Sequence, residues 1–156
     1  MSDRSVLEQH LAVNLFGTHG VTQALLPLLT RSQGAIVNKR VDDGFRPIAV
    51  HSGLRGLQGG RIQPAQSLRA LLAGRGVRVH AVLTEPTDTD MTRGFDIPKA
   101  SPESVARAIF DGVERGDEDI FPDPLSASLS ESWRNGPVKA FEHEYAALVG
   151  AEPVAS

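Results

Sequence analysis

The side chains in this sequence that could bind a metal ion or transfer a proton are few and scattered. No pair of histidines has the H-E-x-x-H spacing that places two imidazoles on one metal ion. The histidines are His10, His19, His51, His80 and His143. Cysteine is absent, which excludes thiol chemistry and disulfides. His51 and Ser52 form an adjacent pair, but neighbouring side chains seldom point the same way. We therefore expect no metal site.

Asn14 is a polar residue within an apolar helical pattern, and the segments around it resemble a known family. It lies in HLAVNLFGT (residues 10–18), which is followed by VTQALLP (21–27) and GAIVN (34–38). These segments resemble the short-chain dehydrogenase/reductases, as do SLRALLAGRGVRVHAV (67–82) and TDM (89–91). In that family the corresponding Asn helps to hold a water molecule in a proton relay. The resemblance thus implies that Asn14 is a retained member of the catalytic tetrad.

The other three tetrad positions hold residues that cannot do the family's chemistry. Aligned without a gap, the catalytic Ser falls on Val41, the Tyr on Leu54 and the Lys on Gln58. In the family, the Tyr exchanges a proton with the substrate oxygen, the Lys lowers the pKa of that Tyr and holds the nicotinamide ribose, and the Ser binds the substrate oxygen. Valine and leucine have no proton to give, and glutamine is uncharged. The chain as written is therefore expected to be catalytically impaired.

The segment of about 39–64 fits the family better if its coding sequence is shifted by one base. With suitable codons, the shifted frame reads Ser at position 41, Tyr at 54 and Lys at 58, within the string A-Y-x-A-S-K-A-A. Our hypothesis is a compensated pair of frame changes, near codon 39 and near codons 61–66. They lie either in the gene or in the reported sequence.

The residues after the expected second strand, TEPTDT (84–89), stand where the family carries Pro-Gly-x-x-x-Thr. Thr89 matches the residue that hydrogen-bonds the nicotinamide carboxamide. Thr84 and Glu85 replace the Pro-Gly pair. Glu85 either places a negative charge where a cofactor would approach, or is a solvated loop carboxylate.

Alternating helical and extended patterns must position these residues. Helical periodicity or helix-start signals occur at Val6–Leu29, Pro64–Leu72, Ser101–Gly116 and Ser126–Val149, the last interrupted at 135–137. Short apolar runs predict strands at Gly34–Asn38, Val77–Leu83 and Ile120–Pro122. This order predicts an α/β fold, specifically the second half of a Rossmann-like, doubly wound parallel sheet. Residues 1–156 are read as one partial domain, with an irregular segment at about 39–64 and without the Gly-rich turn that approaches the cofactor pyrophosphate.

Several charged and aromatic residues have simple structural interpretations. We expect Lys99 to be a solvated loop charge and Glu142, in the run EHE, to lie on an exposed helix face. Trp133, Phe141 and Tyr145 are spaced by eight and four residues, which favours a packing stripe.

The composition limits the classes of partner. A net charge of -3 and the lack of a basic stripe argue against a nucleic-acid partner. No apolar run approaches the ~20 residues of a membrane span, and the first residues lack a signal peptide's apolar core. A cytoplasmic location is the default expectation.

Two functions follow from these observations. The first is an NAD(P)-dependent short-chain oxidoreductase acting on alcohols or ketones; NAD or NADP is the cofactor of intact members, and we expect weak binding by this chain. The alternative is a non-catalytic remnant or association module that uses the family's dimer helices. Its partner would be a second copy or a full-length relative. The sequence does not choose between NAD and NADP or identify the substrate.

Overall fold

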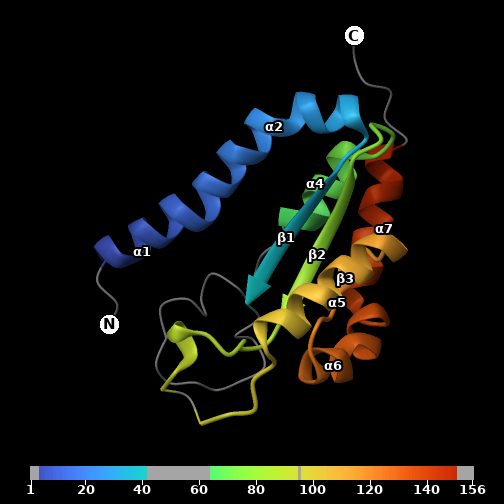
Figure 1. Cartoon of the computed structure of the whole chain (residues 1–156). Coiled ribbons are helices and arrows are strands. Elements are labelled where there is room, and N and C mark those ends of the chain that lie inside the picture. The colour runs from blue at the N-terminus through green and yellow to red at the C-terminus, as the bar shows by residue number, and fades with distance from the viewer. Residues whose placement is uncertain (1–3, 42–63, 95, 151–156) are drawn as a thin grey trace.

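The computed structural model describes residues 4–41, 64–94 and 96–150, which form a small parallel sheet with helices on both faces (Figure 1). The N-terminal helix is continuous through α1 (Arg4–Leu11), the π-helical turn η1 (Ala12–Gly17) and α2 (Thr18–Ser32). The other helices are α4 (Pro64–Leu72), the 3-10 turn η3 (Asp90–Thr92), α5 (Pro102–Arg115), α6 (Pro124–Arg134) and α7 (Pro137–Gly150). The strands are β1 (Ala35–Val41), β2 (Arg78–Thr84) and β3 (Asp119–Ile120).

The three strands are parallel and follow the order β1-β2-β3. Ala35 pairs with Arg78 and Val41 with Thr84, so β1 and β2 end at the same edge. Strand β1 extends to Val41, three residues beyond the expected end, because it pairs along the whole of β2, which is largely buried. Sheet pairing of this kind overrides the low strand propensity of a charged residue such as Lys39. The predicted α/β fold with a parallel sheet is confirmed.

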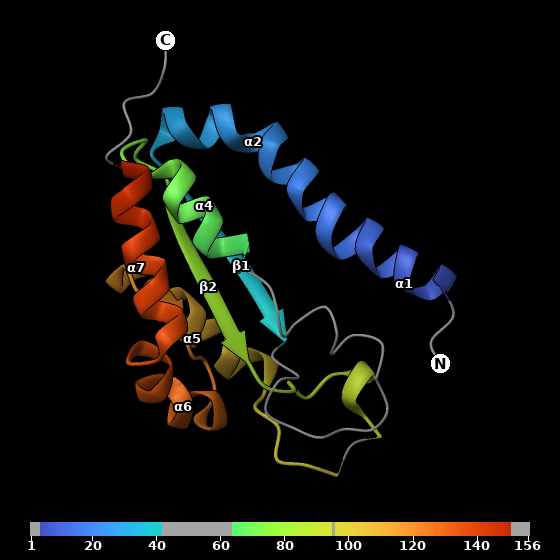
Figure 2. The same ribbon diagram turned by 180° about the vertical axis from the view of Figure 1, so that it is seen from behind.

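The core lies between the sheet and α4. Ala65 and Leu72 of α4 pack with Val79 and Ala81 of β2, which project from one face of the strand. Leu26 and Leu29 of α2 are partly buried against the same cluster. Figure 2 shows α4 and α7 in front of the sheet, whereas α5 is in front in Figure 1. The sheet is therefore covered on both faces, as parallel sheets require.

Local sequence signals set the helix ends. The Ser101 side chain accepts a hydrogen bond from the Ser104 N–H, with Pro102 at the first helical position of α5. Gly116 closes α5 with φ of 78°, a left-handed conformation that favours glycine. The predicted helix over Ser101–Gly116 is confirmed. Its apolar residues are only partly buried, since Val105 is buried but Phe110 is exposed.

The N-terminal helix buries very little of its surface. No residue of η1 or α2 is buried, and the part toward α1 points away from the sheet in both views (Figures 1 and 2). Val13, Phe16, Val21, Leu25 and Leu28 are exposed along it. Its helical pattern is confirmed, but an amphipathic pattern alone does not say what the apolar side covers.

Candidate functional site at the carboxyl edge of the sheet

The carboxyl edge of the sheet holds one predicted site position and the start of the loop that carries another. Val41 ends β1 and pairs with Thr84, which ends β2. Ligands of open α/β sheets bind outside this edge, because the loops that leave parallel strands converge there. Position 41, which aligns with the catalytic Ser, therefore lies beside the start of the loop that carries Thr89.

Thr89 begins the η3 turn and takes part in a reciprocal cap. The Thr89 side chain accepts from the Thr92 N–H, and the Thr89 N–H donates to Thr92 Oγ1 at 3.1 Å. Thr89 Oγ1 also donates a long hydrogen bond of 3.4 Å to the carbonyl of Thr87. The residue is exposed, although its hydroxyl already takes part in the cap and in the bond to Thr87. A hydroxyl oxygen has two lone pairs, so one remains that could accept a hydrogen bond from an amide N–H.

The far side of the loop is fixed by the segment before α5. Thr87 forms a parallel bridge with Ala100, and the Asp88 N–H donates to the Ala100 carbonyl at 2.9 Å. Lys99 Nζ donates to the Thr92 carbonyl at 2.7 Å and lies 3.8 Å from Asp88. The expectation that Lys99 is a solvated charge is wrong, because its side chain lies over the loop and is only 13% exposed.

The near side of the loop is fixed by α6 through Asp123. Asp123 Oδ2 accepts from the Thr84 hydroxyl at 3.2 Å and from the Glu85 N–H at 3.1 Å. Glu85 is 8% exposed, so its interpretation as a solvated carboxylate is wrong. The strand exit is buried because α6 packs over it, and this long-range packing leaves no local mark in the sequence.

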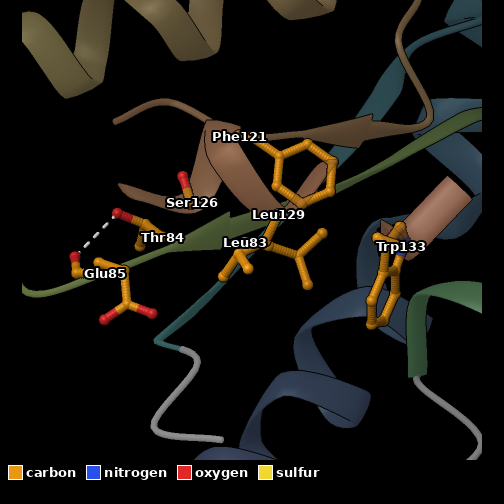
Figure 3. A pocket seen from close by; sticks show the side chains of 7 residues that line it. All are labelled: Leu83, Thr84, Glu85, Phe121, Ser126, Leu129 and Trp133. Atoms are coloured by element: carbon orange, nitrogen blue, oxygen red, sulfur yellow. Dashed lines mark hydrogen bonds between the residues drawn. The ribbon is translucent and has the colours of Figure 1, made fainter. Parts of the chain in front are cut away.

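A small cavity separates the strand exit from α6 (Figure 3). It is lined by Leu83, Thr84, Glu85, Phe121, Ser126, Leu129 and Trp133. Figure 3 shows the Thr84 hydroxyl bonded to the Glu85 carbonyl at one end of the cavity and Trp133 at the other. Its volume of about 10 Å³ is close to that of one water molecule, so it is too small for a cofactor or a substrate.

The remaining predicted site residues are not joined to this loop. Asn14 lies in η1, on the helical arm that points away from the sheet, and its carbonyl accepts from the Thr18 hydroxyl at 3.1 Å. Leu54 and Gln58 lie outside the described residues, as do His51 and Ser52. In the described part of the chain, no group of His, Asp and Glu is placed to hold a metal ion.

A buried ionic cluster joins α4, β3 and α7, and the sequence reading missed it. Arg69 lies 2.8 Å from Asp119 and also pairs with Glu142, while Lys139 contacts Asp119, Glu142 and Glu118 at 2.8–2.9 Å. The prediction that Glu142 is exposed is wrong, since its side chain is 6% exposed. Helix periodicity misassigned it because the face of α7 that meets α4 is charged rather than apolar.

Charge balance holds these groups ionised despite burial. Burial alone would raise the pKa of Asp119, but the Lys139 hydrogen bond and the Arg69 charge outweigh it, so this pKa lies below its ordinary value. Burial alone would lower the pKa of Lys139, yet its hydrogen bonds to Glu118, Glu142 and Asp119 raise it. The groups of this cluster pair with one another across α4, β3 and α7, and we interpret the cluster as structural.

The predicted aromatic stripe does not form in the part of it that is described. Trp133 donates from Nε1 to Asp119 at 3.2 Å and lines the small cavity, whereas Phe141 is 62% exposed. Of the two members whose side chains are described, Trp133 packs as predicted and Phe141 does not, because α6 and α7 are separate helices with different neighbours.

Known families provide an independent test of the resemblance. The family model for short chain dehydrogenases matches residues 1–99, which include the loop that carries Thr89. The chain belongs to the short chain dehydrogenase family. This covers β1, β2 and the loop after them, and the predicted family is confirmed.

Individual relatives agree with this assignment. An uncharacterized oxidoreductase of Staphylococcus epidermidis is 35% identical over 101 residues, covering 62% of this chain and 44% of that protein. Mouse estradiol 17-beta-dehydrogenase 2 is 32% identical over 93 residues, covering 60% of this chain and 24% of the mouse protein. The chain spans less than half the length of these curated relatives.

A solved structure confirms the fold. A short chain dehydrogenase from Burkholderia cenocepacia, crystallised in complex with NADP, superposes with a TM-score of 0.72 at 23% identity. The match covers 97% of this chain and 61% of that one. The chain therefore has a Rossmann-type α/β fold. Within the described ranges, no helix combines the length and apolar character that a membrane span needs.

Proposed function

We propose that this chain is the second half of an NAD(P)-dependent short-chain oxidoreductase domain, and that as written it carries part of the cofactor site but not the catalytic groups. One observation carries the proposal: Val41 pairs with Thr84 at the carboxyl edge, directly before the loop that presents Thr89. In the family, this edge joins the substrate chemistry to the cofactor, whereas the side chain at position 41 of this chain is an alkyl group.

The described residues fit only one end of a nicotinamide dinucleotide. The hydroxyl oxygen of Thr89, an exposed residue, could accept a hydrogen bond from the carboxamide, and the cofactor would supply the hydride. The pyrophosphate normally needs close backbone approach at a Gly-rich strand-to-helix turn, and this sequence has no such turn. We therefore expect low affinity for NAD(P) and derive no hydride-transfer step through the chain as written.

Catalytic impairment follows from the side chains at the tetrad positions. Valine at 41 cannot hydrogen-bond a substrate oxygen, and leucine at 54 cannot donate a proton to it. Glutamine at 58 brings no positive charge. Retention of Asn14 does not compensate, because a water relay has no function without the residue that it reprotonates.

A binding and turnover assay tests the proposal. NADPH and NADH fluorescence titrations should give weak binding, and a panel of secondary alcohols and ketones should give no turnover above buffer. Thr89→Val should weaken the residual NADPH binding about tenfold, since it removes one hydrogen bond to the carboxamide. Turnover by the chain as written, at rates typical of oxidoreductases, would refute the impairment.

The frame hypothesis has a separate test in the coding DNA. Sequencing from well upstream of Met1 through codon 70 should show a one-base correction that restores Ser, Tyr and Lys together, and an in-frame upstream segment with a Gly-rich turn. Confirmation of the given frame would remove the hypothesis and leave a chain that lacks the catalytic groups.

A second candidate function is association, and the exposed apolar side of the N-terminal helix favours it. Val21 and Leu28 on α2 are 61% and 52% exposed, and Phe16 on η1 is exposed as well. No Asp, Glu, Lys or Arg occurs between Ala12 and Thr30. An uncharged apolar helix surface is typical of a protein-protein contact. We propose that it contacts a second copy or a full-length relative.

Sedimentation velocity tests the association. The wild-type chain should sediment as a concentration-dependent oligomer, and Val21→Ser with Leu28→Ser should shift it toward monomer. Phe110→Ser on α5 is the matched control, because Phe110 is 71% exposed but lies elsewhere. Mixing with an intact relative identifies a heteromer. A wild-type monomer that forms no heteromer would exclude this function.

A further inference from the structure

We propose that Asp123 is the positioning residue for the candidate cofactor loop, and that its two carboxylate oxygens have separate tasks. This deepens the proposed function and rests on it for the link to the cofactor. Asp123 is 6% exposed and lies at the N-terminus of α6, thirty-nine residues after Thr84. It is outside the region matched by the family model, which ends at residue 99.

The first oxygen caps α6. Oδ1 accepts from the Leu125 N–H at 3.1 Å and from the Ser126 N–H at 2.9 Å. These N–H groups belong to the first turn of the helix and have no partner within it. A serine at this position would cap the helix about as well, because Ser and Asp are comparable N-cap residues.

The second oxygen holds the strand exit. Oδ2 accepts from Thr84 Oγ1 at 3.2 Å, from the Glu85 N–H at 3.1 Å and from Ser126 Oγ at 2.8 Å. The loop that leads to Thr89 begins at this point. A serine side chain has one oxygen and cannot reach both the helix amides and the strand exit, so the two tasks can be separated by mutation.

Thr84 makes this contact particular to the present sequence. Its hydroxyl, which stands where the family pattern has proline, donates toward both Asp123 Oδ2 and the Glu85 carbonyl. Proline would supply no such donor. Because Thr84 is 1% exposed, its hydroxyl needs buried acceptors, and Asp123 Oδ2 and the Glu85 carbonyl provide them. Together, Thr84 and Asp123 fix the start of a loop that begins with Pro-Gly in the family pattern and with Thr84-Glu85 here.

Loss of the Asp123 contact would affect Thr89 as well, because Thr89 lies on a short loop that is fixed on two sides. Asp123 fixes the start at Glu85, and the Thr87–Ala100 bridge with Lys99 fixes the other side. Loss of the contact between Asp123 and Glu85 leaves the loop that carries Thr89 fixed on one side only. The Thr89 hydroxyl would then sample more positions, and the entropy of fixing it again would lower affinity for the nicotinamide end of the cofactor.

Amide hydrogen exchange with three variants tests this assignment. In Asp123→Ser, the Glu85 amide should exchange about tenfold faster than in wild type, while the Leu125 and Ser126 amides stay near wild type. Asp123→Ala should accelerate all three amides. Thr84→Val, which removes only the hydroxyl, should accelerate Glu85 moderately and leave α6 unchanged.

NADPH titration of the same variants connects the contact to the cofactor. Asp123→Ser should weaken NADPH binding several-fold at a temperature where the variant is fully folded, with only the loss of stability expected for the freed Thr84 hydroxyl and Glu85 N–H. A purely structural role of Asp123 would leave the affinity of the folded protein unchanged. An unchanged Glu85 amide in Asp123→Ser would overturn the assignment. If wild type does not bind NADPH at all, the proposed cofactor function fails, and the exchange rates alone decide whether Asp123 fixes the loop.

Discussion

Arg69 on α4 and Asp119 on β3 are fifty residues apart in the sequence, yet Arg69 Nη2 lies 2.8 Å from Asp119 Oδ1, with side chains only 12% and 5% exposed. Arg69 also donates from Nε to the Val79 carbonyl on β2. One guanidinium thus connects the helix that covers the sheet with two of its strands. A planar group with several donors in a fixed fork is suited to this position.

Removal of this guanidinium should destabilise the fold strongly. Arg69→Met keeps most of the aliphatic packing but leaves Asp119 and Glu142 buried with fewer partners, and loss of one partner from a buried pair costs about 3 kcal/mol or more. Urea denaturation measures the loss. Arg115→Met is the matched control: the Arg115–Asp117 pair has the same 2.8 Å geometry but is largely exposed, so it should cost under ~1 kcal/mol. Equal losses in the two variants would contradict the buried role.

The same cluster predicts stability that falls at both ends of the pH scale. Asp119 and Glu118 have folded pKa values below their ordinary 3.8 and 4.5: burial alone would raise them, but Lys139 and Arg69 outweigh it. Their contribution is present above the ordinary values and is lost as pH falls through the folded ones. Lys139 has a pKa above 10.5, so its contribution is present below that value and is lost as pH rises through the folded pKa.

Urea midpoints measured from pH 3 to pH 11 check this prediction. As far as Asp119, Glu118 and Lys139 determine it, the urea midpoint should be constant between roughly pH 5 and pH 10 and should decrease below and above that range. Asp119→Asn should flatten the acid side of the profile, and Lys139→Met should remove the decline at high pH. An acid side as steep in Asp119→Asn as in wild type would show that other carboxylates control it.

The capping of α5 offers a local test of the structure. Ser101 accepts from the Ser104 N–H at 3.2 Å and is exposed, so Ser101→Ala removes a cap without opening a cavity. We expect a loss of about 1 kcal/mol, and Ser101→Asp should restore it. Thermal denaturation of both variants decides this, since a cap effect requires the alanine and aspartate variants to differ.

Elements with local signals were predictable from the sequence. Residues with fixed backbone or capping preferences set the start of α4 at Pro64 and the two ends of α5 at Ser101 and Gly116. The parallel pairing followed from the alternation of helix and strand. Position 41 was predicted to lie in the irregular segment, because the pairing that extends β1 to Val41 is not visible in the local sequence.

The interactions that fix the site were not predictable, because they join distant segments. Neither the tie between Asp123 and Glu85 nor the burial of Glu142 leaves a local pattern. The charged residue Lys99 lies over the loop only because the segment before α5 folds back to pair with Thr87. A charge in a sequence shows the need for a partner or for water, but tertiary contacts decide which one it has.

The contact between α5 and β3 gives a last prediction, on packing. A Cβ at Gly112 would lie 2.8 Å from Ile120 Cγ1 and 2.9 Å from Cδ1, whereas one at Gly20 on α2 would meet no described atom within 4 Å. Both glycines are helical and outside the left-handed region. Alanine at either site gains up to ~1 kcal/mol in helix propensity, but at Gly112 it also overpacks the core at a cost of about 1–3 kcal/mol.

Gly20→Ala should therefore raise the melting temperature by about 2–4 °C, and Gly112→Ala should lower it. Ile120→Ala removes the atoms that would clash, so Gly112→Ala should be less harmful in that background than in wild type. A double-mutant cycle measures this difference. Without such coupling, the cost at position 112 would not arise from the contact with β3. A gain in stability from Gly112→Ala alone would mean that α5 can move away from β3 at little cost.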